Sequence, residues 1–392
     1  MHKVSILVAI HALILLLFTS QLSISYYEAN IYFNQNNLLH YIVRVFTALF
    51  GENDLALRLP MVLMYSIGAF LYYDISESLF KKHSDKVWSL FLYLLLPGIN
   101  SAAIMVDGAG LVLFLLLVFL YVYKHKRPFA YVLLPLYVFI DASFAFLYLG
   151  FIFYAMEKRH TLVMLSSIVL FGTSMYLFGI EIGGHPKNYF LSTLGIYGAI
   201  FSPIVFIYLI YALYRWGVKE ERSLLWYLGT TAFIFSLLLS FRQQMKLEEL
   251  APFILVSTPL MVKTFLSSYR IRLRPFRKQH RLFLSIAMGV LIMSTFSIYL
   301  NKYMYRFVSK PSKHFVYNNH IVKELSDALK EMGIKAVVTS NARLQLRLRF
   351  YGIDEDPYVH LYEGKAFGQN QKVTISYIGV EVASFYVTNL YK

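Results

Sequence analysis

Residues 108–127 read GAGLVLFLLLVFLYVYKHKR, a run of 16 residues without a charge that is followed by the basic cluster Lys124-His125-Lys126-Arg127. A continuous apolar run is typical of a membrane-spanning helix, and basic residues at its end favour the cytoplasmic side. The whole chain agrees, because 58% of its 392 residues are hydrophobic and its mean hydropathy is +0.54. Only helices and closed barrels satisfy the backbone in lipid, and these runs do not alternate as barrel strands do. We therefore predict a polytopic helical membrane protein.

Further apolar runs extend this pattern along the chain. We predict eleven spans, at about 4–24, 56–79, 86–98, 108–123, 128–141, 143–156, 161–180, 192–214, 223–240, 250–267 and 282–300. With the N-terminus inside, every second loop is basic, at residues 81–86, 124–127, 158–160, 215–222 and 270–281. The net charge of +15 is thus interpreted as a topology signal, and we expect no nucleic-acid partner. The absence of cysteine excludes disulfides, a thiol nucleophile and Cys-ligated zinc.

Two domains are expected, a transmembrane domain over 1–300 and a small extracytoplasmic α/β domain over 301–392. In the first outer loop, NNLLHYIVRVFTALFG (36–51) has apolar side chains at helical spacing, which predicts an interfacial helix. In the tail, NNHIVKELSDALKEMGIK predicts a helix that ends at Gly333. Residues 336–340 and 373–388 are predicted as strands, and the alternation of basic and apolar residues over 343–349 also favours a strand.

Carboxylates stand at the predicted outer ends of spans. Glu28 follows the first span within SISYYEANIYFNQNN, residues 23–37, and Asp107 directly precedes the fourth span. Ionisable residues at membrane depth are costly, so their presence is a functional hypothesis, although Asp107 alone also suits a solvated helix N-cap. Asp141 is interpreted as a turn or N-cap residue between two short spans.

Basic residues on the same predicted face need a separate reason. Arg242 and Lys246 lie there against the positive-inside bias. They suit either an anionic lipid phosphate or a salt bridge to Glu248 or Glu249. His185 and Lys187 suit either a phosphate contact or a solvated loop.

Three stretches carry a family resemblance. LFGENDLALRLPMVL (49–63), INSAAIMVDGAGLVLF (99–114) and RQQMKLEELAPFILVSTPLM (242–261) occur in that order. They resemble segments of the GT-C membrane glycosyltransferases, the class of protein O-mannosyltransferases and lipid A aminoarabinose transferase. The first stretch contains the Arg-Leu-Pro motif at Arg58, the second Asp107 and the third Lys246.

The resemblance implies transfer of a sugar from a polyprenyl-phosphate carrier to a protein, lipid or glycan acceptor. The active face is expected to be extracytoplasmic, in the inner membrane of a bacterium. Glu28 would act as the base, Asp107 would orient the acceptor or hold a divalent cation, and Lys246 with Arg242 would bind the donor phosphate. Two carboxylates are too few to claim a metal site. The family usually has Asp-Glu where this chain has Tyr27-Glu28.

Two other functions stay open from the sequence. A transporter or lipid flippase predicts polar groups at mid-membrane and internal repeats, whereas the polar groups here gather at the ends of spans. A catalytically degenerate relative would bind the lipid-linked sugar without turnover, and Tyr27 favours that alternative.

Overall fold

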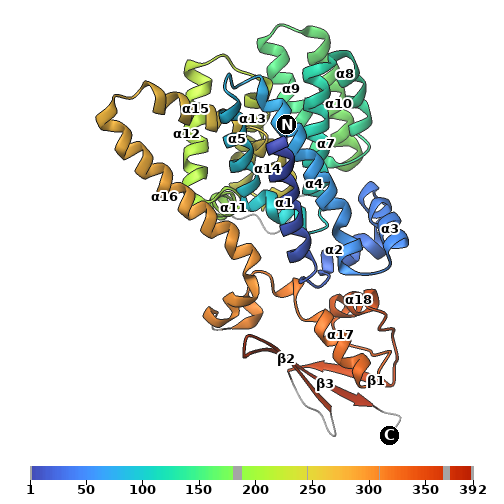
Figure 1. The fold of residues 1–392 in the computed structure, drawn as a ribbon. Coiled ribbons are helices and arrows are strands. Elements are labelled where there is room, and N and C mark those ends of the chain that lie inside the picture. The colour runs from blue at the N-terminus through green and yellow to red at the C-terminus, as the bar shows by residue number, and fades with distance from the viewer. Residues whose placement is uncertain (1, 180–187, 245, 309, 365–370, 390–392) are drawn as a thin grey trace. The chain divides into compact units, whose positions relative to one another are not determined.

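The computed structural model describes residues 2–389 apart from 180–187, 245, 309 and 365–370, and these residues are mainly helical (Figure 1). They form two compact units. The first unit holds residues 1–12, 63–103 and 108–295, and the second holds 13–62, 104–107 and 296–392. The second unit therefore joins the first predicted outer loop to the chain that follows residue 296. The domain boundary at residue 300 stays a prediction.

Helices build the first unit. They are α5 (His83–Leu95), α6 (Pro97–Ile104), α7 (Gly108–His125), α8 (Arg127–Tyr137), η1 (Ala142–Phe144), α9 (Ala145–Glu157), α10 (Thr161–Phe178), α11 (Phe190–Phe201), α12 (Pro203–Lys219), α13 (Leu224–Ser240), α14 (Leu247–Leu255) and α15 (Thr258–Ile271). Three further helices belong in part to each unit, namely α1 (His2–Thr19), α4 (Asp54–Glu77) and α16 (Arg274–Tyr299), and the last residue of α6, Ile104, also lies in the second unit.

Six helical segments of the described chain are long and apolar enough to cross a membrane, and eight are if two bent helix pairs each count as one span. One bent pair covers the span expected over 192–214, and shows that this segment is not one straight helix. There, α11 and α12 meet at an angle of 102°. The bend lies at Ser202, whose φ is +70°, and is followed by Pro203, which has no N–H to continue the helical ladder.

The second unit contains the first-loop helices and the α/β tail. Its elements are α2 (Tyr26–Asn34), α3 (Leu38–Phe50), η2 (Asn301–Phe307), η3 (Pro311–Lys313), η4 (Tyr317–Asn319), α17 (Val322–Glu331), α18 (Ala342–Phe350), β1 (Val359–Glu363), β2 (Gln371–Tyr377) and β3 (Val380–Asn389). The strands form an antiparallel sheet in the order β1-β3-β2, with Val387 opposite both Leu361 and Gln371. Leu325, Leu348 and Phe385 belong to the core between this sheet and α17 and α18 (Figure 1).

The structure confirms most of the predicted tail and corrects two elements. Residues 336–340, predicted as a strand, form only isolated bridges at Ala336 and Val338. Residues 373–388 form the β2–β3 hairpin, and the helix α17 is followed by Gly333 at φ +76°. Residues 343–349, however, belong to the helix α18. Asn341 caps this helix by accepting the N–H groups of Arg343 and Leu344. Leu344 and Leu348, one helical turn apart, are both buried.

The predicted helix of the first loop is α3. Asn37 caps its start by accepting the N–H of His40, and Gly51 follows its end with φ +85°. Leu39 and Val43 are buried on one face, whereas Leu49 on another is 70% exposed. This double apolar surface fits a helix at a membrane interface, and the interfacial location stays a prediction.

Candidate functional site

A capping box places Glu28 at the start of α2. Ser25 is the N-cap residue, and its hydroxyl accepts the N–H of Glu28 at 3.2 Å. In return, Glu28 Oε2 accepts the N–H of Ser25 at 2.8 Å. The local sequence Ser-x-x-Glu therefore turns the Glu28 side chain back along the helix end instead of toward solvent.

Arg58 of α4 pairs with this carboxylate. Arg58 Nε donates to Glu28 Oε1 at 2.7 Å, and Arg58 Nη2 donates to Oε2 at 2.7 Å. The geometry is that of a bidentate guanidinium–carboxylate pair. Both side chains are buried, with relative exposures of 0% for Arg58 and 1% for Glu28. Arg58 of the Arg-Leu-Pro motif thus supplies the positive charge that balances Glu28.

The remaining donors of Arg58 hold the end of α1. Arg58 Nη1 donates to the carbonyls of Thr19 at 3.3 Å and Leu22 at 2.8 Å, and Nη2 donates to Ser23 at 2.9 Å. With the two bonds to Glu28, these contacts occupy all five guanidinium N–H groups. Arg58 therefore joins the carbonyls after α1 to the N-terminus of α2.

The surroundings keep Glu28 ionised. Burial alone would raise the pKa of Glu28, but the guanidinium of Arg58 and the N–H groups of Ser25 and Val106 outweigh it. The pKa of this carboxyl therefore lies below its ordinary value. A carboxylate with a lowered pKa and both oxygens engaged is a weak base.

Glu28 also fixes the backbone beside Asp107. Glu28 Oε1 accepts the N–H of Val106 at 3.0 Å, and Asp107 is the next residue, directly before α7. The side chain of Asp107 is partly exposed, whereas Val106 is buried. The structure thus brings the two predicted carboxylates into one part of the second unit, with Glu28 inside and Asp107 nearer the surface.

A second buried carboxylate, Asp54, was not predicted as a site residue. Tyr351 donates its hydroxyl to Asp54 Oδ1 at 2.6 Å, and Lys323 Nζ lies 3.0 Å from Oδ2. The Tyr351 oxygen in turn accepts the N–H of Ile24 at 2.9 Å. The α/β tail therefore contacts the first loop through buried polar groups.

Arg347 makes the same kind of connection. Arg347 Nε donates to the carbonyl of Ile24 at 2.8 Å, and Nη2 donates to the carbonyl of His320 at 2.8 Å. Burial lowers the pKa of Arg347 to about 10, which still leaves it charged at neutral pH. No sequence signal identified Asp54, Lys323, Arg347 or Tyr351, because their partners lie hundreds of residues away or are backbone groups.

Aromatic and basic side chains lie on the outer side of α2. Tyr27, which stands where the family usually has Asp, is 72% exposed. The guanidinium of Arg343 lies over the ring of the neighbouring Tyr26, 5.2 Å from its centroid. An aromatic surface therefore replaces the expected acidic group beside Glu28.

The other predicted residues lie elsewhere in the chain. Lys246 precedes α14 and is exposed, with Nζ 3.9 Å from Glu249 Oε1, and Arg242 is exposed as well. Asp141 caps η1 by accepting the N–H and the hydroxyl of Ser143 at 2.8 and 2.6 Å, as its N-cap interpretation predicts. His185 and Lys187 lie outside the described residues.

Within the described parts of the chain, His, Asp and Glu side chains form no group of three or more that could hold a metal ion. A divalent cation at the candidate site therefore has no support from side-chain geometry.

The fold has relatives among solved structures. No protein-family model matches the chain, and no curated protein matches it in sequence. Two solved structures do match, both of ArnT from Cupriavidus metallidurans. The apo structure is 13% identical with a TM-score of 0.58, covering 98% of this chain and 97% of that chain. The chain has the ArnT fold.

The second structure is ArnT bound to undecaprenyl phosphate. It is 10% identical with a TM-score of 0.58, covering 98% of each chain. The likeness to ArnT therefore extends over almost the whole length of both proteins. It confirms, for the fold, the GT-C resemblance that the three sequence stretches indicate.

Proposed function

We propose that this protein is an integral membrane glycosyltransferase that moves a hexosyl or pentosyl group from a polyprenyl-phosphate donor to an acceptor. The observation that carries the proposal is the ArnT fold over 98% of the chain. The undecaprenyl phosphate in one ArnT structure supports a lipid-phosphate partner. Protein, lipid and envelope glycan are all suitable acceptors. The proposed topology has eleven spans, with the N-terminus inside and the active face extracytoplasmic.

In the proposed chemistry, different residues act on the leaving phosphate and on the acceptor. The leaving group is already an anionic phosphate, so it needs positive charge more than a proton, and Lys246 and Arg242 are proposed to supply that charge. The acceptor hydroxyl or amine needs a base within hydrogen-bond reach. Asp107 suits this role better than Glu28, because Glu28 is enclosed and bound by Arg58. Glu28 is then a positioning residue, which acts through the N–H of Val106.

Turnover by the purified protein tests the proposal. With a polyprenyl-phosphate sugar pool, the protein should release polyprenyl phosphate in an acceptor-dependent way. Asp107→Asn should lower kcat by about 10²- to 10⁴-fold, the usual contribution of a general base. The matched control is Asp327→Asn in α17, an exposed carboxylate of the same unit, which should leave kcat unchanged. Full activity of Asp107→Asn would remove Asp107 from the mechanism.

Tyr27 supports a second candidate, a relative that binds the lipid-linked sugar without transferring it. In that case, a labelled polyprenyl-phosphate sugar would bind the protein while no acceptor in any pool yields polyprenyl phosphate. Tyr27→Asp would then restore the residue that the family usually has. Release of polyprenyl phosphate by the unmodified protein would eliminate this candidate.

A further inference from the structure

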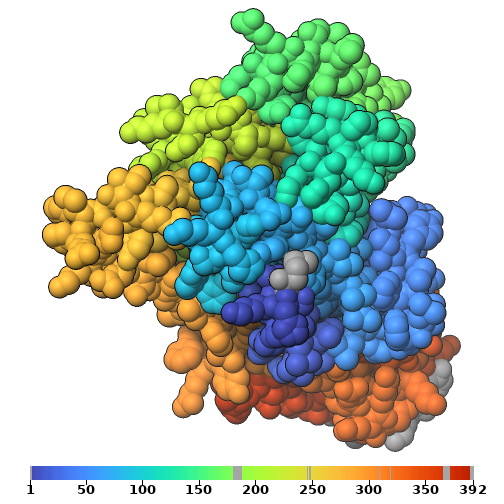
Figure 2. Space-filling model, turned by 45° about the horizontal axis from the view of Figure 1, so that its top comes forward, coloured from blue at the N-terminus to red at the C-terminus, as the bar shows by residue number. Residues whose placement is uncertain are grey.

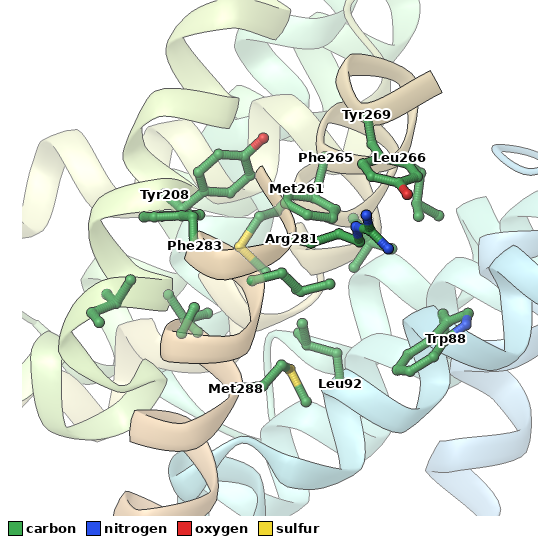
Figure 3. A pocket seen from close by; sticks show the side chains of 15 residues that line it. Trp88, Leu92, Tyr208, Met261, Phe265, Leu266, Tyr269, Arg281, Phe283 and Met288 are labelled. Atoms are coloured by element: carbon green, nitrogen blue, oxygen red, sulfur yellow. The ribbon is translucent and has the colours of Figure 1, made fainter. Parts of the chain in front are cut away.

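An apolar cavity lies among four helices of the first unit. It has a volume of about 290 Å³ and is lined by residues of α5, α12, α15 and α16 (Figure 3). Tyr208, Phe265 and Met288 are among its apolar lining side chains. A cavity of this size and character is suited to hydrocarbon.

One end of the cavity carries a cation. Arg281 is the charged residue of the lining, and it lies near Tyr269, whereas Leu92 and Met288 lie toward the other end (Figure 3). Arg281 is exposed and has no ion-pair partner within the described residues. Seven residues separate Arg281 from Met288 on α16, which is roughly 10 Å along a helix. The cavity therefore extends from a charged end into an apolar interior.

The charged end belongs to a wider basic segment. Residues 270–281, RIRLRPFRKQHR, contain six Arg or Lys residues and no carboxylate. Arg270 is paired with Asp85 at 2.6 Å, but Arg272, Arg274 and Lys278 are exposed. Figure 2 shows this part of the chain, coloured gold, on the outside of the molecule. Such a segment attracts anionic lipid headgroups near a membrane surface.

The helix α16 beside the cavity is little covered by protein. Only 22% of its apolar stretch is buried, compared with 78% in Glu249–Ile271, which contains most of α14 and α15. One wall of the cavity is therefore a helix whose apolar surface is largely uncovered. A hydrocarbon chain beside α16 would supply apolar contacts to that surface.

We propose that this cavity binds one anionic phospholipid of the bilayer, with an acyl chain among the apolar side chains and the phosphate on Arg281. A guanidinium binds phosphate through paired hydrogen bonds, and the cavity accepts the chain. The site is separate from the proposed donor site. Residues 249–271 are long enough to cross a membrane, and at roughly 1.5 Å per residue they extend about 35 Å between the Lys246 end and the basic end.

Native mass spectrometry of the full-length protein in detergent tests the proposal. The probes are phosphatidylglycerol and phosphatidylcholine with identical acyl chains. We expect one phosphatidylglycerol to bind at least 10-fold more tightly than phosphatidylcholine. Arg281→Gln should abolish that preference, whereas Arg274→Gln, which removes an exposed charge of the same segment outside the cavity lining, should keep it.

Substitutions that fill the cavity provide an independent test of the proposal. Ala287 is a buried lining residue, so Ala287→Trp should displace the acyl chain and weaken phosphatidylglycerol binding at least 10-fold. Ala287→Phe serves the same purpose if the larger side chain prevents folding. Equal losses in Arg281→Gln and Arg274→Gln would indicate unspecific charge attraction and overturn the proposal. Unchanged binding in the Ala287 variants, or displacement of phosphatidylglycerol by equimolar polyprenyl phosphate, would also overturn it.

Discussion

Arg58 has a role that a lysine cannot fill. Its five N–H groups reach Glu28 and three carbonyls after α1 in a planar arrangement, whereas an ammonium has three donors on one point charge. The pair is buried, so removal of either partner leaves the other charge without compensation. The stability of the second unit should therefore depend strongly on Arg58.

We predict that Arg58→Met lowers the free energy of unfolding by about 3–5 kcal/mol, the usual cost of an orphaned buried charge. Arg58→Lys should lower the free energy of unfolding by an intermediate amount, because lysine keeps the positive charge but not the planar five-donor geometry. Denaturant unfolding in detergent would measure both. Arg306→Met, at an exposed arginine of the same unit, is the matched control and should change little. Equal stabilities of Arg58→Met and the control would show that the pair contributes nothing.

The lowered pKa of Glu28 predicts a pH dependence. The stability that ionised Glu28 contributes is present above its ordinary pKa of 4.5 and is lost as pH falls through the lower pKa of the folded state. The difference in unfolding temperature between the natural protein and Glu28→Gln should therefore be largest near pH 7. It should shrink when the pH falls below about 4.5. A difference that grows in acid would contradict the assigned direction.

At these residues, sequence and structure agree in part. The resemblance identified Glu28, Arg58 and Asp107, and the structure places all three in the second unit. The ion pair was not predicted, because 30 positions separate its partners and no pattern connects them. The capping box Ser25-x-x-Glu28 was readable from the sequence and would have indicated that Glu28 folds back onto its helix. The catalytic roles of Glu28 and Asp107 stay predictions.

Among the helices, close approach depends on individual glycines. Gly229 of α13 faces Ser257, and a Cβ built at Gly229 would lie 2.7 Å from Ser257 Cβ. Gly172 of α10, by contrast, has nothing within 4 Å of such a Cβ. The two glycines belong to the same unit and both lie in helices, so they form a matched pair.

Gly229→Ala is expected to destabilise the protein by about 1–3 kcal/mol, because the helices must move apart or strain. Gly172→Ala should instead be neutral or stabilising by up to about 1 kcal/mol, since alanine favours the helix. Thermal unfolding in detergent compares the variants. Equal effects of the two substitutions would mean that α13 and Ser257 are not in close contact.

The elements also show where sequence patterns mislead. Over 343–349, basic and apolar residues alternate as in a strand, yet the segment is helical because Asn341 caps it and Leu344 and Leu348 reach one core. Residues 336–340, predicted as a strand, form only isolated bridges from Ala336 and Val338. Long apolar helices were predicted well, because their signal needs no distant partner.

At the scale of the whole molecule, the second unit combines segments that are distant in sequence. The first loop and the α/β tail are joined by hydrogen bonds at Ser23 and Ile24. The N–H groups of Ser23 and Ile24 donate to the carbonyl of Asn319 and the hydroxyl of Tyr351. In the other direction, Arg347 Nε donates to the carbonyl of Ile24. The tail and the first loop share one compact unit, so the tail is part of the framework around Glu28 and Asp107. The separate tail domain after residue 300 stays a prediction.

We predict that the double variant Arg347→Met and Tyr351→Phe speeds hydrogen exchange at the amides of residues 20–25. Both substitutions remove side-chain bonds to Ile24, and the helices α17 and α18 should keep their protection. Hydrogen exchange with mass spectrometry would measure this. Lys335→Gln, at an exposed tail residue, is the control. Unchanged exchange in the double variant would show that the first loop holds its conformation without the tail.

The bond between Arg347 and Ile24 has a consequence during synthesis, because its partners are 323 positions apart. At a ribosomal rate of 5–20 residues per second, Ile24 is made roughly 16 to 65 s before Arg347. Glu28 and Arg58, only 30 positions apart, emerge within about 2 to 6 s of each other. The Glu28–Arg58 ion pair can therefore form early in synthesis. The hydrogen bond from Arg347 to Ile24 can form only after the tail is translated. A ribosome that stalls before Arg347 leaves a chain with the charge pair but without the anchor.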